Sequence, residues 1–310
     1  MKVTAKVPAT TANLGPGFDS FGMALPIYNE ITIEETVMPG TGIEISVIAD
    51  NQEDLNIMMI PTDNTNIVYK AVELLYNSIG QTPSELKITI KSDIPIAKGL
   101  GSSASVIVGG LMAANELLGR PADEAALLSI ATEVEGHPDN VTPAIVGGIV
   151  ISSQEEDGRV VYRKLNWPQD WNIMVCVPDY ELATDIARSV IPKEIPLKDA
   201  IFNLKRSAMF VQAVSTADEE LMKLALTDKL HQPYRMKLVP GLNEIINNLK
   251  HEEDVLGCVL SGAGPAILVI TKGNSQEQIK DIIKNTWLDL NVKSDIQVLK
   301  IEDTGAVILN

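Results

Sequence analysis

The segment at residues 94–105, IPIAKGLGSSAS, constrains the fold most, because it joins an alternating strand at 86–91 to an apolar helix predicted over 102–118. That helix is apolar nearly all round, which predicts that it is buried. Gly99 and Gly101 permit positive φ and a close backbone approach, and Ser102 or Ser103 is expected to cap the helix. Free N–H groups at a buried helix start bind anions, so the segment predicts a loop for a triphosphate. The alternative, an ordinary helix cap, needs only one Ser and one Gly.

Two familiar phosphate loops do not fit this segment. In the P-loop pattern a lysine follows the glycines, whereas Lys98 precedes them. The dinucleotide-binding pattern requires an acidic residue at the end of a second strand about 20 residues on, but a helix is predicted to begin there, over 122–135. The segment is therefore a third type of phosphate loop.

Two further segments are rich in small residues. PATTANLGPGFDSFG at 8–22 is too dense in Thr, Gly and Asn for a simple connection and predicts a binding loop, although any one residue there fits an ordinary turn. Within it, Asn13 offers both a donor and an acceptor, and Asp19 can accept from an amine or a hydroxyl. LSGAGP at 260–265 lies between two apolar strands, as a hairpin or a close cover over a ligand loop.

Together these three segments resemble the three motifs of the GHMP kinase superfamily. HPDNVTPA at 137–144 and HQPYRMKLVPG at 231–241 are similar, within it, to the homoserine kinases. The resemblance implies ATP-dependent phosphorylation of the side-chain hydroxyl of L-homoserine, a step of threonine biosynthesis. It also implies a two-domain α+β fold, with a left-handed βαβ crossover in the N-terminal domain and a ferredoxin-like C-terminal domain. We expect these domains at 1–160 and 161–310, with the substrates in the cleft between them.

The nucleotide and metal residues follow from the same resemblance. Asn66 resembles the family's nucleotide-side segment, with a helix cap as the alternative, and Lys87 is a weaker candidate. Mg²⁺ prefers hard oxygen ligands, which Ser103 and a glutamate at the end of the third helix, Glu135 rather than Glu133, would supply. The alternative for either glutamate is a solvated helix end. The expected ATP-binding run is Pro95, Ile96, Ala97, Lys98, Gly99, Leu100, Gly101, Ser102, Ser103, Ala104 and Ser105.

The substrate residues are more dispersed. The resemblance implies that His137, Asp139 and Asn140 bind homoserine, together with Asn13 and with Asp19 on the amine. Asn140 stands where sugar and mevalonate kinases can carry an aspartate base, and an amide cannot take a proton. We therefore expect in-line transfer without an assigned base, with Asn140, Asp139 and Ser103 as the catalytic residues. A substrate carboxylate calls for arginine, and Arg188 and Arg235 match the family's pattern, with surface salt bridges as the alternative.

Composition excludes other classes of function. The chain has 41 acidic and 25 basic residues, a net charge of −16, which disfavours nucleic acid and anionic membranes as partners. The two cysteines lie in apolar runs, and neither a signal peptide nor a membrane span is visible, which indicates a cytoplasmic protein. A homodimer is implied only by the resemblance. The alternatives are a kinase for another small alcohol, such as mevalonate or a sugar, and a non-catalytic relative.

Hydrophobic patterning predicts the remaining elements. Helices are expected at 66–79, 184–190, 197–214, 242–249 and 276–285, and strands near 3–7, 29–34, 43–48, 144–152, 172–177, 255–260, 266–270, 297–301 and 306–309.

Overall fold

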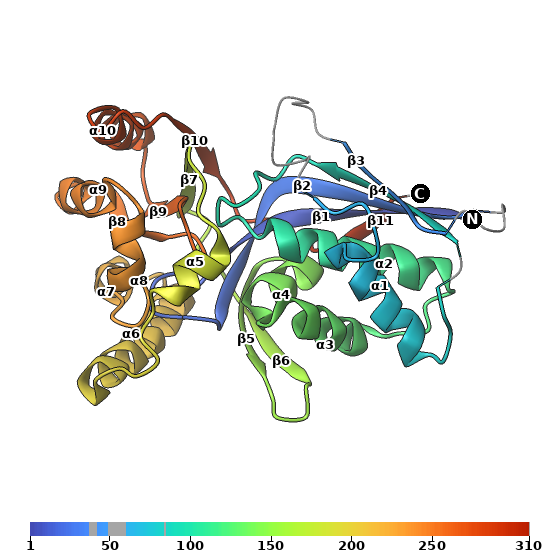
Figure 1. Ribbon diagram of the computed structural model, residues 1–310. Coiled ribbons are helices and arrows are strands. Elements are labelled where there is room, and N and C mark those ends of the chain that lie inside the picture. Colours follow the sequence, from blue (N-terminus) through green and yellow to red (C-terminus); the bar gives the residue numbers. More distant parts are fainter. Residues whose placement is uncertain (37–41, 49–59, 84, 310) are drawn as a thin grey trace.

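The computed structural model describes residues 1–36, 42–48, 60–83 and 85–309, which form two β-sheets, both covered by helices (Figure 1). The first sheet has the order β11-β1-β2-β4-β3, and the hairpin of β5 and β6 joins it because β5 pairs with β2. Its strands are β1 (Lys2–Ala12), β2 (Phe21–Glu35), β3 (Glu44–Ile48), β4 (Leu86–Ser92), β5 (Ile149–Gln154), β6 (Val160–Leu165) and β11 (Val307–Leu309).

Alternating apolar residues turn one face of this sheet toward four helices. Ile31 and Ile33 on β2 and Ile88 and Ile90 on β4 are buried in the same core. The helices of this layer are α1 (Ile67–Ser78), α2 (Ser102–Leu117), α3 (Glu124–Glu135) and α4 (Pro138–Val146). Helix α2 is buried along most of its length and lies against β1 and β2, as its apolar sequence predicts. This packing fixes the start of α2, and with it the glycine loop (residues 94–101) that precedes it.

The crossover of this domain runs from β3 through α1 to β4, and β3 and β4 pair in parallel. Helix α1 begins at Asn66, whose side chain accepts a hydrogen bond from the Val68 N–H. Asp123 caps α3 in the same way through the Ala126 N–H. These caps follow the ordinary preference for Asn and Asp at helix starts.

The second sheet has the order β10-β7-β9-β8 and all its pairings are antiparallel. Numbered along the chain, this is the 4-1-3-2 arrangement of a ferredoxin-like domain, as expected. Its strands are β7 (Asn172–Pro178), β8 (Val255–Leu260), β9 (Ile267–Thr271) and β10 (Ser294–Leu299). Its helices are α5 (Thr184–Ser189), α6 (Leu197–Thr216), α7 (Glu219–Ala225), α8 (Gln232–Arg235), α9 (Leu242–Leu249) and α10 (Gln276–Leu288).

Two features join the sheets. A hydrophobic core contains Phe21 and Met23 of β2 together with Ile173 of β7 and Phe210 of α6. Strand β11 returns from the end of the chain to pair with β1. The domain boundary between residues 160 and 161 stays a prediction. Strands β6 and β11, which lie at or after this boundary in the sequence, pair with strands of the first sheet.

Several expected boundaries are wrong. Strand β1 extends to Ala12 and β2 begins at Phe21, so the predicted loop over 8–22 is confined to residues 13–20. Residues 138–146 form a helix, α4, that was not predicted, and the strand expected from 144 begins at Ile149. The short helices α7 and α8 were not expected. No helix among the described residues is long and apolar enough to cross a membrane.

Candidate active site

The glycine loop is held by backbone contacts. Gly99 has φ +79°, and a Cβ there would lie 2.3 Å from the carbonyl oxygen of Ser261. The Ser261 hydroxyl donates to the Gly99 carbonyl (2.6 Å), and the Ala266 N–H donates to the Lys98 carbonyl (3.0 Å). The segment 260–265 therefore acts as the expected close cover over the loop, and only glycine fits at residue 99.

Lys98 anchors the loop to the second domain. Its Nζ donates to the carbonyl oxygens of Pro178 (3.0 Å) and Tyr180 (2.7 Å), although the residue also lines the cavity. The Leu182 N–H donates to the Ala97 carbonyl (3.2 Å), which adds a second link. The structure thus shows the lysine of this loop engaged by the protein, where the sequence suggested a nucleotide contact.

Helix α2 starts without a side-chain cap. Its N-cap is Gly101, with φ +64°, and no side chain of the described residues caps the helix start, so the expected cap by Ser102 or Ser103 is wrong. Uncapped N–H groups at a helix start are donors for an anion. Ser102 and Ser103 line the cavity beside them. Ala104 and Ser105 are fully buried in α2 and lie behind the lining.

Glu135 ends α3 opposite Ser103. The Ser103 hydroxyl donates to Glu135 Oε2 at 2.8 Å, and both residues line the cavity. Burial raises the pKa of Glu135, and the hydrogen bond from Ser103 partly offsets this rise. Glu133 is exposed and does not line the cavity, so of the two candidates only Glu135 faces the glycine loop. A carboxylate and a hydroxyl side by side are a donor set of the type that Mg²⁺ binds.

A cavity of about 740 Å³ connects these parts. It extends from Asn66 and Ile67 at the start of α1, past Pro95 and the glycine loop, to Arg235. Asn66 both caps α1 and lines this cavity. Lys87 lies outside it and pairs with Glu44 at 2.9 Å, so its sequence-based assignment to the nucleotide is not supported by its position.

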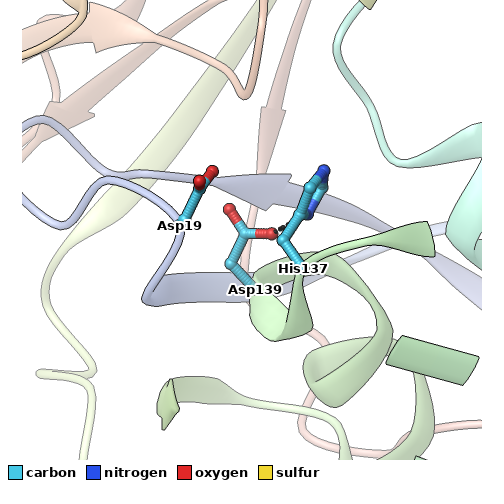
Figure 2. A group of neighbouring side chains, drawn as sticks. All are labelled: Asp19, His137 and Asp139. Carbon is cyan, nitrogen blue, oxygen red and sulfur yellow. Dashed lines mark hydrogen bonds and ion pairs between the residues drawn. The ribbon is translucent and has the colours of Figure 1, made fainter. Parts of the chain in front are cut away.

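The far end of the cavity carries ionisable side chains, and we call Asp19, His137, Asp139, Arg188 and Arg235 the charged end. Figure 2 shows Asp19, on the loop after β1, beside His137 and Asp139 at the start of α4. One ligand atom of each of these three residues lies within 4.8 Å of the others. His137 Nδ1 is 2.5 Å from Asp139 Oδ1. Burial lowers the pKa of His137, but this hydrogen bond and the nearby carboxylates outweigh it and raise the pKa overall.

Both predicted arginines reach the charged end. Arg188 on α5 binds Asp19 through two hydrogen bonds, Nη1 to Oδ2 (3.0 Å) and Nη2 to Oδ1 (2.8 Å). Arg235 on α8 is 2% exposed and donates to the carbonyl oxygens of Ala187 and Gly262. Burial and the nearby Arg188 lower the pKa of Arg235 to about 10, so it remains a cation at neutral pH. Among the described residues no group bonds to Nη2 of Arg235, which leaves two donors for a ligand.

Asn13 shapes the loop that carries Asp19. It has φ +70°; its Nδ2 donates to the Gly262 carbonyl (2.8 Å), and its Oδ1 accepts from the Asp19 N–H (3.0 Å). Its side chain lines the cavity, but both of its polar atoms are engaged by the protein. Asn13 is therefore placed to set the position of Asp19, a task that its residue type alone did not reveal.

The sequence analysis did not identify His231 and Phe18 as residues of this site. His231 is fully buried and stacks on Phe18, with ring centroids 5.1 Å apart. Its Nε2 lies 2.9 Å from the Gly15 carbonyl, so this nitrogen carries the proton, and Nδ1 accepts from Arg235 Nη1 at 3.4 Å. In the sequence, the only indication of the role of His231 is its spacing from Arg235, which is one helical turn.

The comparisons with known proteins agree with this arrangement. Residues 66–148 match the family model of the GHMP kinases N terminal domain, and residues 209–289 match that of the GHMP kinases C terminal. A homoserine kinase from Clostridium botulinum is 41% identical, with 99% of each chain covered. One from Caldicellulosiruptor saccharolyticus is 40% identical, with 99% of this chain and 97% of the relative covered. The crystal structure of homoserine kinase from Cytophaga hutchinsonii superposes with a TM-score of 0.87 at 27% identity, covering 99% of this chain and 97% of that one.

Proposed function

The chain belongs to the homoserine kinase family of the GHMP kinases, and from this we propose that it phosphorylates the side-chain hydroxyl of L-homoserine with ATP. The product would be O-phospho-L-homoserine, an intermediate of threonine biosynthesis. One observation supports this most directly: a single cavity has uncapped helix N–H groups at one end and two arginines with two aspartates at the other. The first end suits a nucleotide phosphate and the second a zwitterionic amino acid.

The charges of L-homoserine fit the charged end. Its ammonium group would bind Asp19 and Asp139, and its carboxylate would bind Arg188 and the two open donors of Arg235. Because Arg188 and Asp19 bind each other in the structure, each would exchange its partner for a substrate group. The side-chain hydroxyl of the substrate would then point toward Asn140 and the glycine loop.

ATP would place its phosphates on the N–H groups at the start of α2, with the base toward Asn66 and Ile67. Ser103 and Glu135 fit Mg²⁺ as oxygen donors beside that position. When bound, the ion would neutralise part of the phosphate charge.

Transfer would proceed in line: the homoserine oxygen forms a bond to the γ-phosphorus as the bond to ADP breaks, and the hydroxyl proton leaves to an oxygen of the transferred phosphoryl group. Asn140 cannot accept a proton, and Asp139 is already bonded to His137, so no residue is assigned as a base. The contribution of this chain is to hold the hydroxyl and the γ-phosphate in line and to exclude water. Positioning of this kind supplies a large part of the acceleration in such reactions.

The test is ADP release by purified protein with Mg·ATP and a panel of L-homoserine, D-homoserine, L-threonine, mevalonate and galactose. We expect turnover with L-homoserine alone. Turnover with mevalonate or galactose instead would overturn the assigned roles of Arg188 and Arg235 and retain the phosphate site. ATP binding without turnover of any alcohol would contradict the proposed activity.

Cellular location and oligomeric state complete the proposal. A cytoplasmic location agrees with Cys176 and Cys258, which are buried and free of disulfides. A homodimer is proposed from the family alone, and sedimentation of the purified protein tests it.

A further inference from the structure

Thr10 and Asn140 form a buried contact beside the cavity, which Asn140 lines. The Thr10 side-chain hydroxyl donates to Asn140 Oδ1 at 2.8 Å, although the residues are 130 positions apart. Thr10 is fully buried, and Asn140 is 9% exposed where it lines the cavity. We propose that Thr10 is a positioning residue for Asn140, which turns the amide so that its NH₂ group faces the substrate. This inference rests on the proposed kinase function.

The neighbours of Asn140 determine the orientation of its amide. Asn140 Nδ2 lies 3.3 Å from Asp139 Oδ1, and a carboxylate oxygen only accepts hydrogen bonds. The NH₂ group must therefore lie on the Asp139 side, which leaves Oδ1 for Thr10. A hydroxyl can donate or accept, and here it donates. With the amide reversed, Asn140 Oδ1 would face Asp139 Oδ1, and neither of these acceptor oxygens could donate a hydrogen bond to the other.

This orientation decides what Asn140 offers a ligand. One N–H of the amide is directed at Asp139, and the second is available to an oxygen in the cavity. Such a donor can bind a lone pair of the substrate hydroxyl or an oxygen of the γ-phosphate. It holds the nucleophile in place and takes no proton from it, in agreement with a mechanism without an assigned base.

Thr10 also ties Asn140 to the glycine loop. Its N–H donates to the Leu100 carbonyl at 3.1 Å. A Cβ on Gly101 would lie 1.9 Å from Thr10 Oγ1 and 3.0 Å from Asn140 Oδ1, so only glycine permits this approach. One residue thus contacts both the loop that would hold the γ-phosphate and the amide that would hold the acceptor. Its position sets the spacing between them.

The test removes the hydroxyl with little change of shape. We expect Thr10→Val to lower kcat with L-homoserine by about tenfold to a hundredfold, the usual cost of misplacing a reacting group. KM for ATP should stay within about twofold, because the N–H groups of α2 are untouched. Thr10→Ser keeps the donor and should retain kcat within about threefold.

A matched control is Thr142→Val. Thr142 is also fully buried and lies two residues after Asn140, but its hydroxyl has no hydrogen-bond partner among the described residues. The kcat of the Thr142→Val variant should match that of the wild type, because no hydrogen bond is lost. If Thr10→Val behaved like this control, the proposal would be overturned.

A double-mutant cycle separates positioning from general damage. In an Asn140→Ala background, Thr10→Val should cost less than about twofold in kcat, because the group that Thr10 positions is gone. A loss as large as in the wild-type background would mean that Thr10 acts elsewhere, and would overturn the proposal.

The proposed function is tested separately by wild-type turnover of L-homoserine. If another alcohol of the panel is phosphorylated instead, the same cycle is measured with that alcohol. If none is, the cycle is measured by urea unfolding, where the Thr10–Asn140 bond should appear as a coupling of about fivefold in the unfolding equilibrium. Additive effects in that measurement would overturn the proposal, whatever the substrate.

Discussion

The two ends of the cavity are built on opposite principles. At the glycine-loop end, backbone carbonyl and N–H groups provide most of the contacts. Gly99 and Gly101 are required there because they lack a side chain. At the charged end, five ionisable side chains from four separate segments face one another. The first end fits one rigid shape, whereas the second is a set of charges that can change partners.

This difference suits the two ligands. Phosphates bound by fixed N–H groups need no extra lysine or arginine, which the acidic N-terminal half scarcely has; Arg120 is its only arginine before residue 150. An amino acid carries both charges, so a site for it needs acidic and basic side chains together. The bidentate pair of Arg188 and Asp19 supplies one of each.

The largest expected loss of activity comes from adding a methyl group to the glycine loop. Gly99→Ala places a Cβ 2.3 Å from one backbone carbonyl and 2.8 Å from another, at φ +79°. We expect kcat/KM to fall by at least about a hundredfold, because the loop must move away from the helix start. Gly80→Ala, at φ +71° in open space, should cost only about 1–2 kcal/mol of stability and leave kinetics unchanged. Steady-state kinetics and urea unfolding measure both; an active Gly99→Ala enzyme would refute the rigid-loop account.

Removing a charge from the other end should affect one substrate alone. Arg235→Ala is expected to raise KM for L-homoserine by about a hundredfold, since truncating a buried charged partner costs about 2–5 kcal/mol. KM for ATP should not change. Arg159, exposed and paired with Asp157, gives the control Arg159→Ala, which should behave as wild type. An unchanged KM for homoserine would remove Arg235 from the site.

Ser103 and Glu135 lie between the two ends, and their loss should act on the nucleotide alone. We expect Ser103→Ala and Glu135→Gln each to raise KM for Mg·ATP by about tenfold, through loss of an oxygen donor. Glu133→Gln, two residues earlier and exposed, is the control. Wild-type Mg²⁺ titrations for both variants would exclude these residues from the metal site.

The smallest expected effect is on pH dependence. Burial raises the pKa of Glu135, so its carboxylate is protonated at a higher pH than an ordinary glutamate. Use of Mg·ATP should be complete well above this pKa and weaken as the pH falls through it, with KM rising by no more than about threefold from neutral into the acidic range. Glu135→Gln should flatten the profile over this range. A wild-type profile as flat as that of the variant would contradict the role of Glu135.

The rigid end was predictable because its signal is local. A strand, two glycines and an apolar helix lie within one short stretch of the chain, and hydrophobic periodicity indicated both flanking elements. The uncapped start of α2 was not predictable, because a serine after a glycine is usually read as a cap. The charged end needed the fold, since Asp19 and Arg188 are 169 residues apart. Asp19 was singled out from the chemistry of its own segment, the other four residues were named with the help of family resemblance, and periodicity gave no indication of any of them.

Helix α4 shows why one element was missed. Prolines are usually helix breakers, and no helix was predicted over the stretch that contains Pro138 and Pro143. In the structure Pro138 occupies the first turn, where no N–H is needed. Pro143 leaves the Asp139 carbonyl without its helical donor, and this oxygen lies against Gly22 of β2, where a Cβ would be 1.7 Å away. Gly22 of β2 leaves room for this oxygen because it has no side chain, and no pattern within residues 138–146 reveals that fit.

The pairing of β11 with β1 has a consequence for synthesis on the ribosome. Strand β1 is made well before its partner, because Val307–Leu309, which pair with it, follow about 300 residues later. At about 5–20 residues per second, one edge of the first sheet stays open for tens of seconds. An open strand edge invites pairing with other chains, so the nascent protein is most exposed to aggregation while its second domain is being translated.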